Sequence, residues 1–211
     1  MSQIIAVINQ KGGVGKSTTA HALGAGLILK GYSVLFVDLD YQGNLSYSMG
    51  ANTKGYNALG VLERPETAKE EIQHTASGDI IASSPKLAGA DKLLEDTGKE
   101  YRLKEALESL QGIVQLSGTI ETVRKYCNPS LSIMGIVLTR YNARSTIRRE
   151  VAEMLEQTAE QLHTKLYSTK IRECVSIVEA QAMKKPIYSY APRSNATADY
   201  KALVAEILGE E

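Results

Sequence analysis

Residues 9–19 read NQKGGVGKSTT, and they follow directly on an apolar run, IIAVI, at residues 4–8. A glycine-rich turn between a strand and a helix presents backbone N–H groups to phosphate oxygens, and the helix dipole adds to the attraction. Gly12, Gly13 and Gly15 permit the backbone angles and the close approach that such a turn requires. We therefore predict a phosphate-binding loop here, with a purely structural glycine turn as the alternative.

The residue types in and after this loop are those that bind a nucleotide and its metal. Lys16 can reach the β- and γ-phosphates, and the hydroxyl of Ser17 can ligate Mg²⁺. The nucleotide-binding residues predicted from this loop are Gly12, Gly13, Val14, Gly15, Lys16, Ser17 and Thr18. The usual pattern G-x-x-x-x-G-K-[ST] would place glycine at position 10, where this chain has Gln10. A second lysine, Lys11, opens the loop instead.

An acidic segment follows a second apolar run, SVLFVD, at residues 33–38. Asp38 and Asp40 stand at the carboxyl end of this predicted strand, where open α/β sheets bind their ligands. Alternate residues of an extended chain point to opposite faces. One carboxylate could therefore face Mg²⁺ while the other reaches an attacking water only if the chain turns. Capping of the following loop is the alternative role for both.

The rest of the chain alternates between predicted strands and predicted helices. The predicted strands are residues 3–8, 33–38, 79–82, 131–139 and 166–168, and the predicted helices are residues 16–30, 56–62, 83–94, 146–162 and 198–208. This order predicts an α/β fold of the P-loop NTPase type, with a doubly wound, mostly parallel sheet and helices on both faces. A chain of 211 residues suits one such domain over residues 1–211.

Composition narrows the class of protein further. Lysine and arginine total 24, as do aspartate and glutamate, so binding to nucleic acid would need a local basic patch. Cys127 and Cys174 lie far apart, which argues against a disulfide framework or a zinc site. No apolar run approaches the ~20 residues that span a bilayer, and the N-terminus lacks the pattern of a signal peptide. We expect a reduced, soluble, cytoplasmic protein.

Together these motifs resemble the ParA/MinD group of deviant-Walker P-loop ATPases, and more closely its ParA-type partition ATPases. The similar segments are VDLDYQGN at 37–44, where Tyr41 replaces the proline of the family's D-x-D-P-Q-G-N, GIVLTRYNAR at 135–144, VEAQAMKKPIYSYAP at 178–192, and residues 195–208. The resemblance implies that Mg²⁺ and ATP are the cofactors and that ATP drives dimerisation. Lys11 would then reach the nucleotide phosphates bound by the second subunit, much as an arginine finger does.

The resemblance also implies roles for individual residues. The catalytic set would be Lys11, Lys16 and Asp40, with Asp40 positioning or activating the attacking water. Asp38 would lie near Mg²⁺, which Ser17 ligates. Gln42 and Asn44 would belong to a switch that senses the γ-phosphate.

The implied partners are a second copy of the chain, DNA bound without sequence preference on the nucleoid, and a centromere-binding ParB-like protein. The basic candidates for contacts with DNA phosphates are Arg144, Arg148, Arg149, Arg172, Lys184, Lys185 and Arg193. A merely solvated helix face is the alternative for Arg148 and Arg149. The family's I-P-R-x-x-R is replaced here by Ile171-Arg172-Glu173, with Ser176 further on. The C-terminal helix is acidic at its tip, so no membrane partner is expected.

One part of the family's pattern is missing from this sequence. The family has a further strand, ending in D-x-P-P, next to the strand that precedes the loop, and a helix and another central strand follow it. The flanking segments place the gap between about Ser109 and Gly112, where two predicted helices, 101–110 and 113–126, directly adjoin. A helical hairpin is the other interpretation of this pair. A strand–helix–strand unit takes ~30 residues or more.

The missing unit matters for both fold and function. Without it we expect the flanking strands to be unpaired or re-registered. Hydrolysis is then less secure than nucleotide binding, and the alternative function is a non-hydrolysing nucleotide-binding scaffold or a DNA-binding module. A small-molecule synthetase on the same fold is a third class, against which the VDLDYQGN segment argues.

Overall fold

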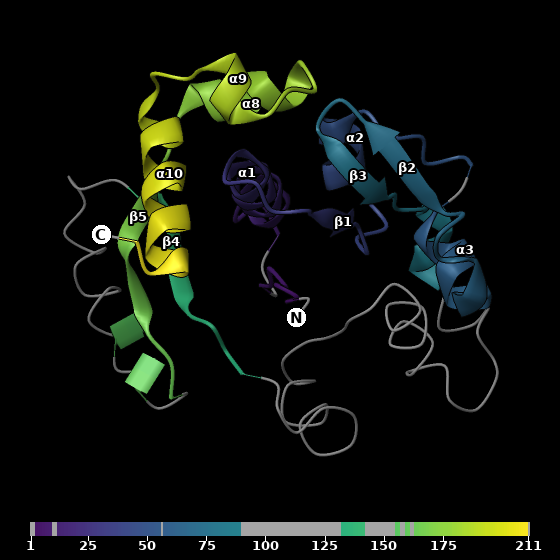
Figure 1. Cartoon of the computed structure of the whole chain (residues 1–211), viewed down its shortest axis with the longest axis horizontal. Coiled ribbons are helices and arrows are strands. Elements are labelled where there is room, and N and C mark those ends of the chain that lie inside the picture. Colours follow the sequence, from purple (N-terminus) through teal and green to yellow (C-terminus); the bar gives the residue numbers. More distant parts are fainter. Residues whose placement is uncertain are drawn as a thin grey trace.

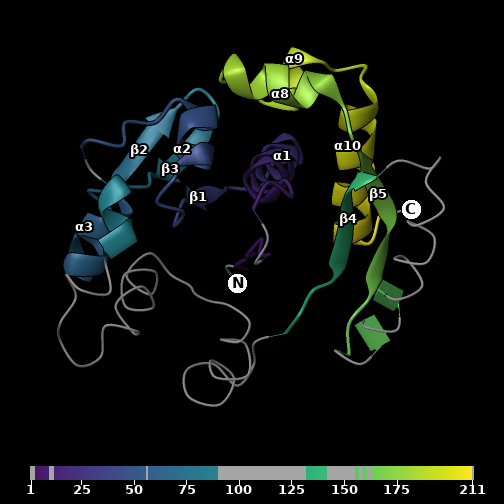
Figure 2. The same ribbon diagram turned by 180° about the vertical axis from the view of Figure 1, so that it is seen from behind.

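The structure is a computed structural model that describes residues 3–9, 12–55, 57–89, 132–141, 155–156, 159–160 and 163–210. In chain order its main elements are α1 (Lys16–Leu29), β1 (Leu35–Val37), α2 (Asn44–Met49), α3 (Ala58–Glu63), η1 (Pro65–Thr67), β2 (Ile72–Thr75), β3 (Gly78–Ile81), η2 (Pro85–Gly89), β4 (Ile136–Tyr141), β5 (Leu166–Arg172), α8 (Val175–Ala182), α9 (Ile187–Tyr190) and α10 (Asn195–Leu208). Figure 1 shows α1 near the centre, and Figure 2 shows the same arrangement from behind.

The described strands form two sheets. In the first, β1 pairs in parallel with β3, with Leu35 opposite Asp79, and β2 pairs with β3 in an antiparallel hairpin. In the second, β4 pairs in parallel with β5. The predicted α/β class of the P-loop NTPase type is confirmed. The antiparallel hairpin was not predicted.

The predicted strand over residues 3–8 is wrong. Residues 3–9 lie outside both sheets, and the side chains of Ile4 and Ile8 are 39% and 40% exposed. A strand persists only where a neighbour takes its backbone hydrogen bonds, and no described strand pairs with this segment. The segment's apolar composition suits a sheet, but it has no pairing partner among the described strands.

The helix α1 links the two sheets because glycines let it approach its neighbours. A Cβ atom at Gly24 would lie 2.3 Å from the ring of Phe36 in β1. At Gly26 it would lie 2.5 Å from the Tyr188 hydroxyl in α9 and 2.7 Å from Val204 in α10. The helix therefore packs against β1 on one side and against α9 and α10 on another, between the two sheets in Figures 1 and 2.

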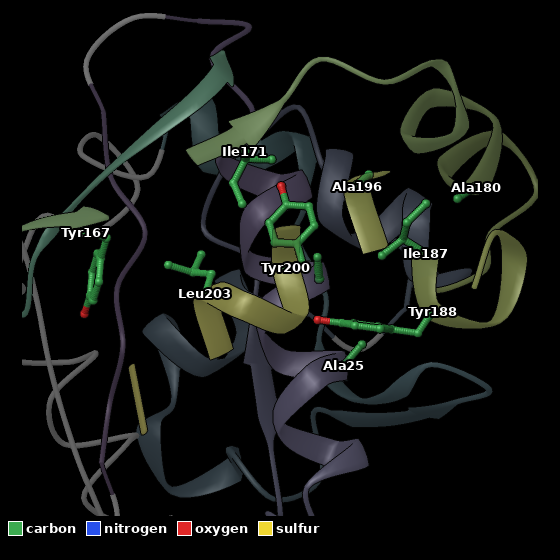
Figure 3. Close-up of a cluster of buried hydrophobic side chains, with 10 residues drawn as sticks. Ala25, Tyr167, Ile171, Ala180, Ile187, Tyr188, Ala196, Tyr200 and Leu203 are labelled. Carbon is green, nitrogen blue, oxygen red and sulfur yellow. The ribbon is translucent and has the colours of Figure 1, made fainter. Parts of the chain in front are cut away.

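The larger core surrounds α10. Figure 3 shows Tyr200 and Leu203 of this helix beside Ile171 of β5 and Ile187 of α9. Tyr200 and Leu203 are each 1% exposed, and burying one large apolar side chain contributes about 1.5–3 kcal/mol. A second core forms under β3, where Ile80 packs with Phe36, Leu45 and Met49. The site described below lies where the elements of these two cores meet.

Most of the other predicted helices and strands that fall on described residues are present in the structure. The structure confirms the helices at 16–30, 56–62 and 198–208 as α1, α3 and α10, and the strands at 33–38, 79–82 and 166–168 as β1, β3 and the longer β5. The strand at 131–139 begins later, as β4, and the helix from residue 83 is a 3-10 helix, η2, as far as it is described. The helices at 101–110 and 113–126, the gap between Ser109 and Gly112, and most of the helix at 146–162 lie outside the described residues.

Candidate nucleotide site

The glycine loop has the backbone that a phosphate-binding turn needs. Gly13 and Gly15 have φ of +70° and +88°, and Gly15 is the N-cap of α1. Apart from the neighbouring residues of the loop, no atom of the described part of the chain lies within 4 Å of where a Cβ would stand on Gly12, Gly13 or Gly15, so these residues leave the space beside the loop open. The loop leads straight into the first turn of α1, whose N–H groups and dipole favour an anion. This geometry fits the phosphates of a nucleotide.

The structure describes all of the predicted ligands of that nucleotide except Lys11. Lys16, Ser17 and Thr18 are half-buried in the first turn of α1, next to the loop. Ser17 is thus placed one residue after the lysine at the helix start, where a hydroxyl can meet a metal on the phosphates. Lys11 lies outside the described residues.

Strand β4 supports the loop from behind. The Thr139 hydroxyl donates to the Val14 carbonyl at 2.7 Å, and Nη1 of Arg140 donates to the Gly13 carbonyl at 3.1 Å. Nη2 of Arg140 also donates to Glu173 Oε1 at 2.6 Å. Thr139 and Arg140 belong to the GIVLTRYNAR segment, but no individual role was predicted for either residue.

Two further helices fix the start of α1. Nε2 of Gln181 in α8 donates to the Thr18 hydroxyl at 2.9 Å. The Thr19 hydroxyl lies 3.2 Å from the Tyr200 hydroxyl of α10. The loop helix is therefore tied by polar contacts to elements more than 160 residues away in the sequence.

Asp38 follows β1 and is only 4% exposed. Its Oδ2 accepts hydrogen bonds from the backbone N–H of Ser46 at 2.9 Å and from the Ser46 hydroxyl at 2.7 Å. Its Oδ1 accepts from the backbone N–H of Asp40 at 3.2 Å. An ionised carboxylate offers about four acceptor positions, so the chain itself fills most of them. Any contact between Asp38 and Mg²⁺ would use what remains on Oδ1.

Asp40 stands where the chain turns, as the sequence analysis required. The N–H of Gly43 donates to the Asp40 carbonyl at 2.8 Å, which closes the turn. The Asp40 carboxylate is half-buried and accepts from the N–H of Gln42 at 3.0 Å. The predicted switch residues Gln42 and Asn44 meet through a side-chain hydrogen bond of 3.3 Å. The whole segment thus forms a compact turn ahead of α2.

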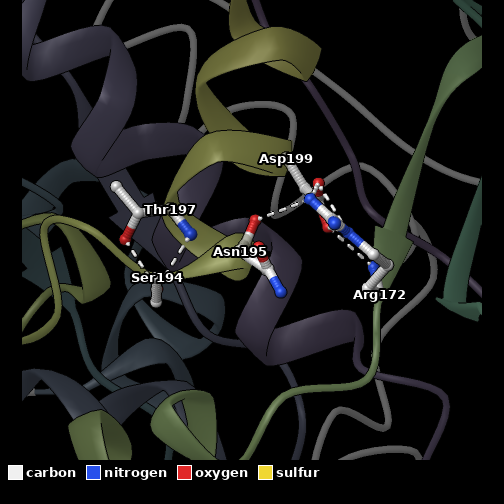
Figure 4. Close-up of polar contacts among 5 residues, drawn as sticks. All are labelled: Arg172, Ser194, Asn195, Thr197 and Asp199. Carbon is white, nitrogen blue, oxygen red and sulfur yellow. Dashed lines mark hydrogen bonds and ion pairs between the residues drawn. The ribbon is translucent and has the colours of Figure 1, made fainter.

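The basic candidates for DNA contacts are not equivalent. Figure 4 shows the guanidinium of Arg172 turned onto Asp199 of α10, with Nε 2.9 Å from Oδ2 and Nη2 bonded to Oδ1. These hydrogen bonds raise the pKa of Arg172 above its usual range. Lys184 lies with Nζ 5.0 Å from the ring centre of Tyr47, and Lys185 and Arg193 are exposed. Arg144, Arg148 and Arg149 lie outside the described residues.

A phosphate-binding loop at the start of a central helix, followed by an acidic turn at the end of a parallel strand, defines a P-loop nucleotide-binding protein. Residues 5–187 match the family model of the CobQ/CobB/MinD/ParA nucleotide binding domain. The chain belongs to this family. None of the described helices is long and apolar enough to cross a membrane.

Curated relatives match the chain over nearly all of its length. The chain is 31% identical to the sporulation initiation inhibitor protein Soj of Bacillus subtilis, over 98% of each chain. It is 30% identical to the chromosome partitioning protein ParA of Caulobacter vibrioides, over 99% of this chain and 95% of that protein. It is 31% identical to the chromosome-partitioning ATPase Soj of Thermus thermophilus, over 97% and 94%.

The alignment with the Bacillus relative also bears on the missing segment. It spans 252 positions, 41 more than the 211 residues of this chain. At least that many positions of the alignment therefore have no residue here. The shortfall is large enough for the strand–helix–strand unit whose absence is predicted between about Ser109 and Gly112.

Solved structures agree on the fold and on the cofactors. A cobyrinic acid a,c-diamide synthase of Mycobacterium smegmatis with bound ATP analog and magnesium has a TM-score of 0.75 at 26% identity, covering 95% of this chain and 92% of that chain. The cell division ATPase MinD of Pyrococcus furiosus has a TM-score of 0.69 at 24% identity, over 99% of each chain, which shows the fold alone. The predicted cofactors, ATP and Mg²⁺, are confirmed at the level of neighbours crystallised with a nucleotide and magnesium.

Proposed function

We propose that this chain is a partition ATPase. Binding of Mg-ATP drives two copies to dimerise and to bind DNA without sequence preference, and hydrolysis of the ATP releases both interactions. The observation that carries the proposal is the open loop with positive φ at Gly13 and Gly15, placed at the start of α1 and followed by the acidic turn. Relatives named as chromosome-partitioning proteins support it.

In this proposal, each residue of the nucleotide site has its own role. The loop N–H groups and Lys16 bind the phosphates, and Ser17 ligates the metal. Mg²⁺, when bound, supplies charge neutralisation on the phosphates. Asp40 orients the attacking water from its turn, and Asp38 holds that turn in place. Lys11 of one copy contacts the phosphates held by the other copy.

The experiment that tests hydrolysis is a steady-state ATPase assay with and without DNA. Asp40→Ala should lower kcat by about 10²-fold or more, while ATP-dependent dimerisation, followed by light scattering after size-exclusion chromatography, is retained. Lys16→Ala should lose nucleotide binding itself. Asp79→Ala, which removes an exposed carboxylate on β3, is the matched control and should behave as the wild type. Normal turnover in Asp40→Ala would exclude Asp40 from catalysis.

The proposed partners are a second copy, DNA and a centromere-binding ParB-like protein. Lys184, Lys185 and Arg193 are the described residues proposed to face DNA phosphates. The ParB-like protein would stimulate hydrolysis by the DNA-bound dimer. Its addition to the assay above should raise kcat only when DNA and ATP are both present.

A second function is favoured by one observation, the 41 or more positions missing relative to the Bacillus Soj protein. In the family, the missing unit carries an aspartate associated with the metal. Without it the chain would serve as a nucleotide-binding scaffold that dimerises or binds DNA but does not hydrolyse ATP. ATP-dependent dimerisation with no turnover by the wild-type chain would establish this alternative.

A further inference from the structure

Four residues form a closed ring of hydrogen bonds behind the acidic turn. Asp38 Oδ2 accepts from the Ser46 hydroxyl at 2.7 Å, and the Ser46 oxygen accepts from the backbone N–H of Ser83 at 2.8 Å. The Ser83 hydroxyl donates to the Asp40 carbonyl, and the Asp40 N–H returns to Asp38 Oδ1 at 3.2 Å. We call these four residues the switch ring.

The parallel pairing of β1 and β3 assembles this ring. Val37 lies opposite Ile81, so the two strands end at the same edge of the sheet. The N–H of Asp38 donates to the Ile81 carbonyl at 3.1 Å, which carries the pairing one residue further. Ser83 lies two residues after the end of β3 and contacts the turn that follows β1.

Three of the four residues of the switch ring are buried. Ser46 and Ser83 are each 0% exposed, and Asp38 is 4% exposed. The Ser46 hydroxyl both donates and accepts within the ring, so its hydrogen-bonding capacity is used on two members. Buried polar groups that are satisfied in this way fix a single arrangement of the chain, because any other leaves a donor or acceptor unpaired.

The ring holds the main chain of Asp40 on both sides. Its N–H is bound by Asp38 and its carbonyl by Ser83, which lies 43 residues further along the chain. The Asp40 side chain departs from a backbone that the ring has already fixed. A displacement of 1 Å in a group that orients a reactant can cost about 10²-fold in rate.

We propose that Ser83 is a positioning residue for Asp40. Its hydroxyl sets where the Asp40 carboxylate stands when ATP is bound, and Ser46 completes the ring by orienting the Ser83 backbone. This role rests on the proposed function, since it requires that the chain hydrolyse ATP through Asp40. Nucleotide binding through the glycine loop does not depend on it.

The test separates positioning from stability by measuring kcat, KM for ATP, nucleotide affinity and melting temperature for Ser83→Ala. We expect kcat to fall about tenfold or more, with KM and the Kd for a fluorescent ATP analogue within twofold of the wild type. Ser83→Thr keeps the hydroxyl and should retain more turnover than Ser83→Ala. Ser84→Ala, a neighbouring buried serine outside the ring, is the control and should keep the wild-type kcat.

Two results would overturn the inference, and they are distinguishable. Wild-type kcat in a folded Ser83→Ala variant would remove the role of Ser83 alone. A wild-type chain without turnover would remove the proposed function and this role together. If Ser83→Ala fails to fold, as judged by circular dichroism, Ser83→Cys keeps the shape of the side chain with a slightly larger atom and a weaker donor. A reduced kcat in that variant supports the inference, and an unchanged kcat overturns it.

Discussion

One buried histidine, His21 in α1, contributes to how the stability of the fold depends on pH. It is 5% exposed, it meets Phe36 edge-on, and its Nε2 has no hydrogen-bond partner among the described residues. Burial lowers the pKa of His21 from 6.5 to about 4, because the charged ring would lose its hydration. The unfolded chain therefore binds a proton at this residue at a higher pH than the folded chain does.

The expected consequence is a loss of stability as the pH falls from about 6.5 to about 4. Within this window the unfolded state takes up the proton and the folded state does not, so the contribution of His21 amounts to about 3 kcal/mol. Urea unfolding at pH 7 and at pH 4.5 measures it. His21→Leu cannot titrate and should lose clearly less stability over the same interval. Equal losses in both proteins would show that His21 is not the residue responsible.

The ion pair between Arg172 and Asp199 leads to a second prediction at this scale. Asp199 is 8% exposed, so removing its partner leaves a buried carboxylate with fewer donors. Arg172→Ala should lower the melting temperature while leaving the salt dependence of DNA binding unchanged. Lys185→Ala should leave the melting temperature unchanged and should reduce the slope of log Kd for DNA against log salt concentration by about 0.9. A reduced slope in Arg172→Ala would place that arginine at DNA phosphates.

Sequence reasoning found some site residues and missed others for a physical reason. Lys16 and Ser17 are recognisable because their chemistry depends on a fixed local spacing within one loop. Ser83, Thr139 and Arg140 act through contacts made across the sheets, with the acidic turn or with the loop. No local sequence pattern identifies these three residues, because the pairing of the strands determines which groups they contact.

At the scale of single elements, α1 depends on two glycines that its own helical propensity does not favour. Alanine in a helix is better than glycine by about 1 kcal/mol. At Gly24, however, the added methyl would collide with a Phe36 ring that is itself 5% exposed. Overpacking of this kind costs about 1–3 kcal/mol, and the ring has little room to move.

Gly24→Ala should therefore destabilise the protein, by about 1 kcal/mol net once the gain in propensity is set against the collision. Thermal unfolding followed by circular dichroism measures the change. Gly89→Ala, where no atom of the described residues lies within 4 Å of the added Cβ, is the control and should have little effect. A Gly24→Ala protein more stable than the wild type would mean that Phe36 can move aside at little cost.

Elements with a strong local signal were predictable, and those that depend on a neighbour were not. The helix α10 carries an apolar stripe, and its start at Asn195 is fixed by the Ser194 hydroxyl, which accepts from the Thr197 N–H at 3.2 Å (Figure 4). Residues 3–8 have an equally strong apolar run, yet they form no strand. An apolar composition indicates that a segment suits a sheet. It does not show that an adjacent strand is present to pair with it.

At the scale of the whole molecule, the described strands form two separate sheets with α1 between them. β1 and β4 each have one neighbour among the described strands, β3 and β5 respectively. The helix α1 and the cores on its two sides hold the two sheets together. The nucleotide loop is contacted by β4, and the first turn of α1 that follows the loop is contacted by α8 and α10.

This arrangement predicts how the backbone exchanges its hydrogens with solvent. Ile80 and Ile81 lie in β3, which is paired on both sides, so their amides should be among the slowest to exchange. Amides of residues 3–9, which lie outside both sheets, should exchange about 10³-fold faster or more. Hydrogen exchange followed by mass spectrometry of peptides that cover both segments measures the difference. Addition of Mg-ATP should protect residues 12–18 without protecting residues 3–9.

Protection of residues 3–9 comparable to that of β3 would contradict this account. It would mean that a strand pairs with the segment in solution, closing the sheet beside the nucleotide loop. ATP hydrolysis would then be expected from the structure as well as from the similarity to partitioning ATPases. Fast exchange together with measurable ATP turnover would lead to a different conclusion: loop, acidic turn and switch ring would suffice for hydrolysis without a continuous central sheet. Fast exchange without turnover would favour the scaffold, because the loop would bind nucleotide while the chemistry lacked its supporting strands.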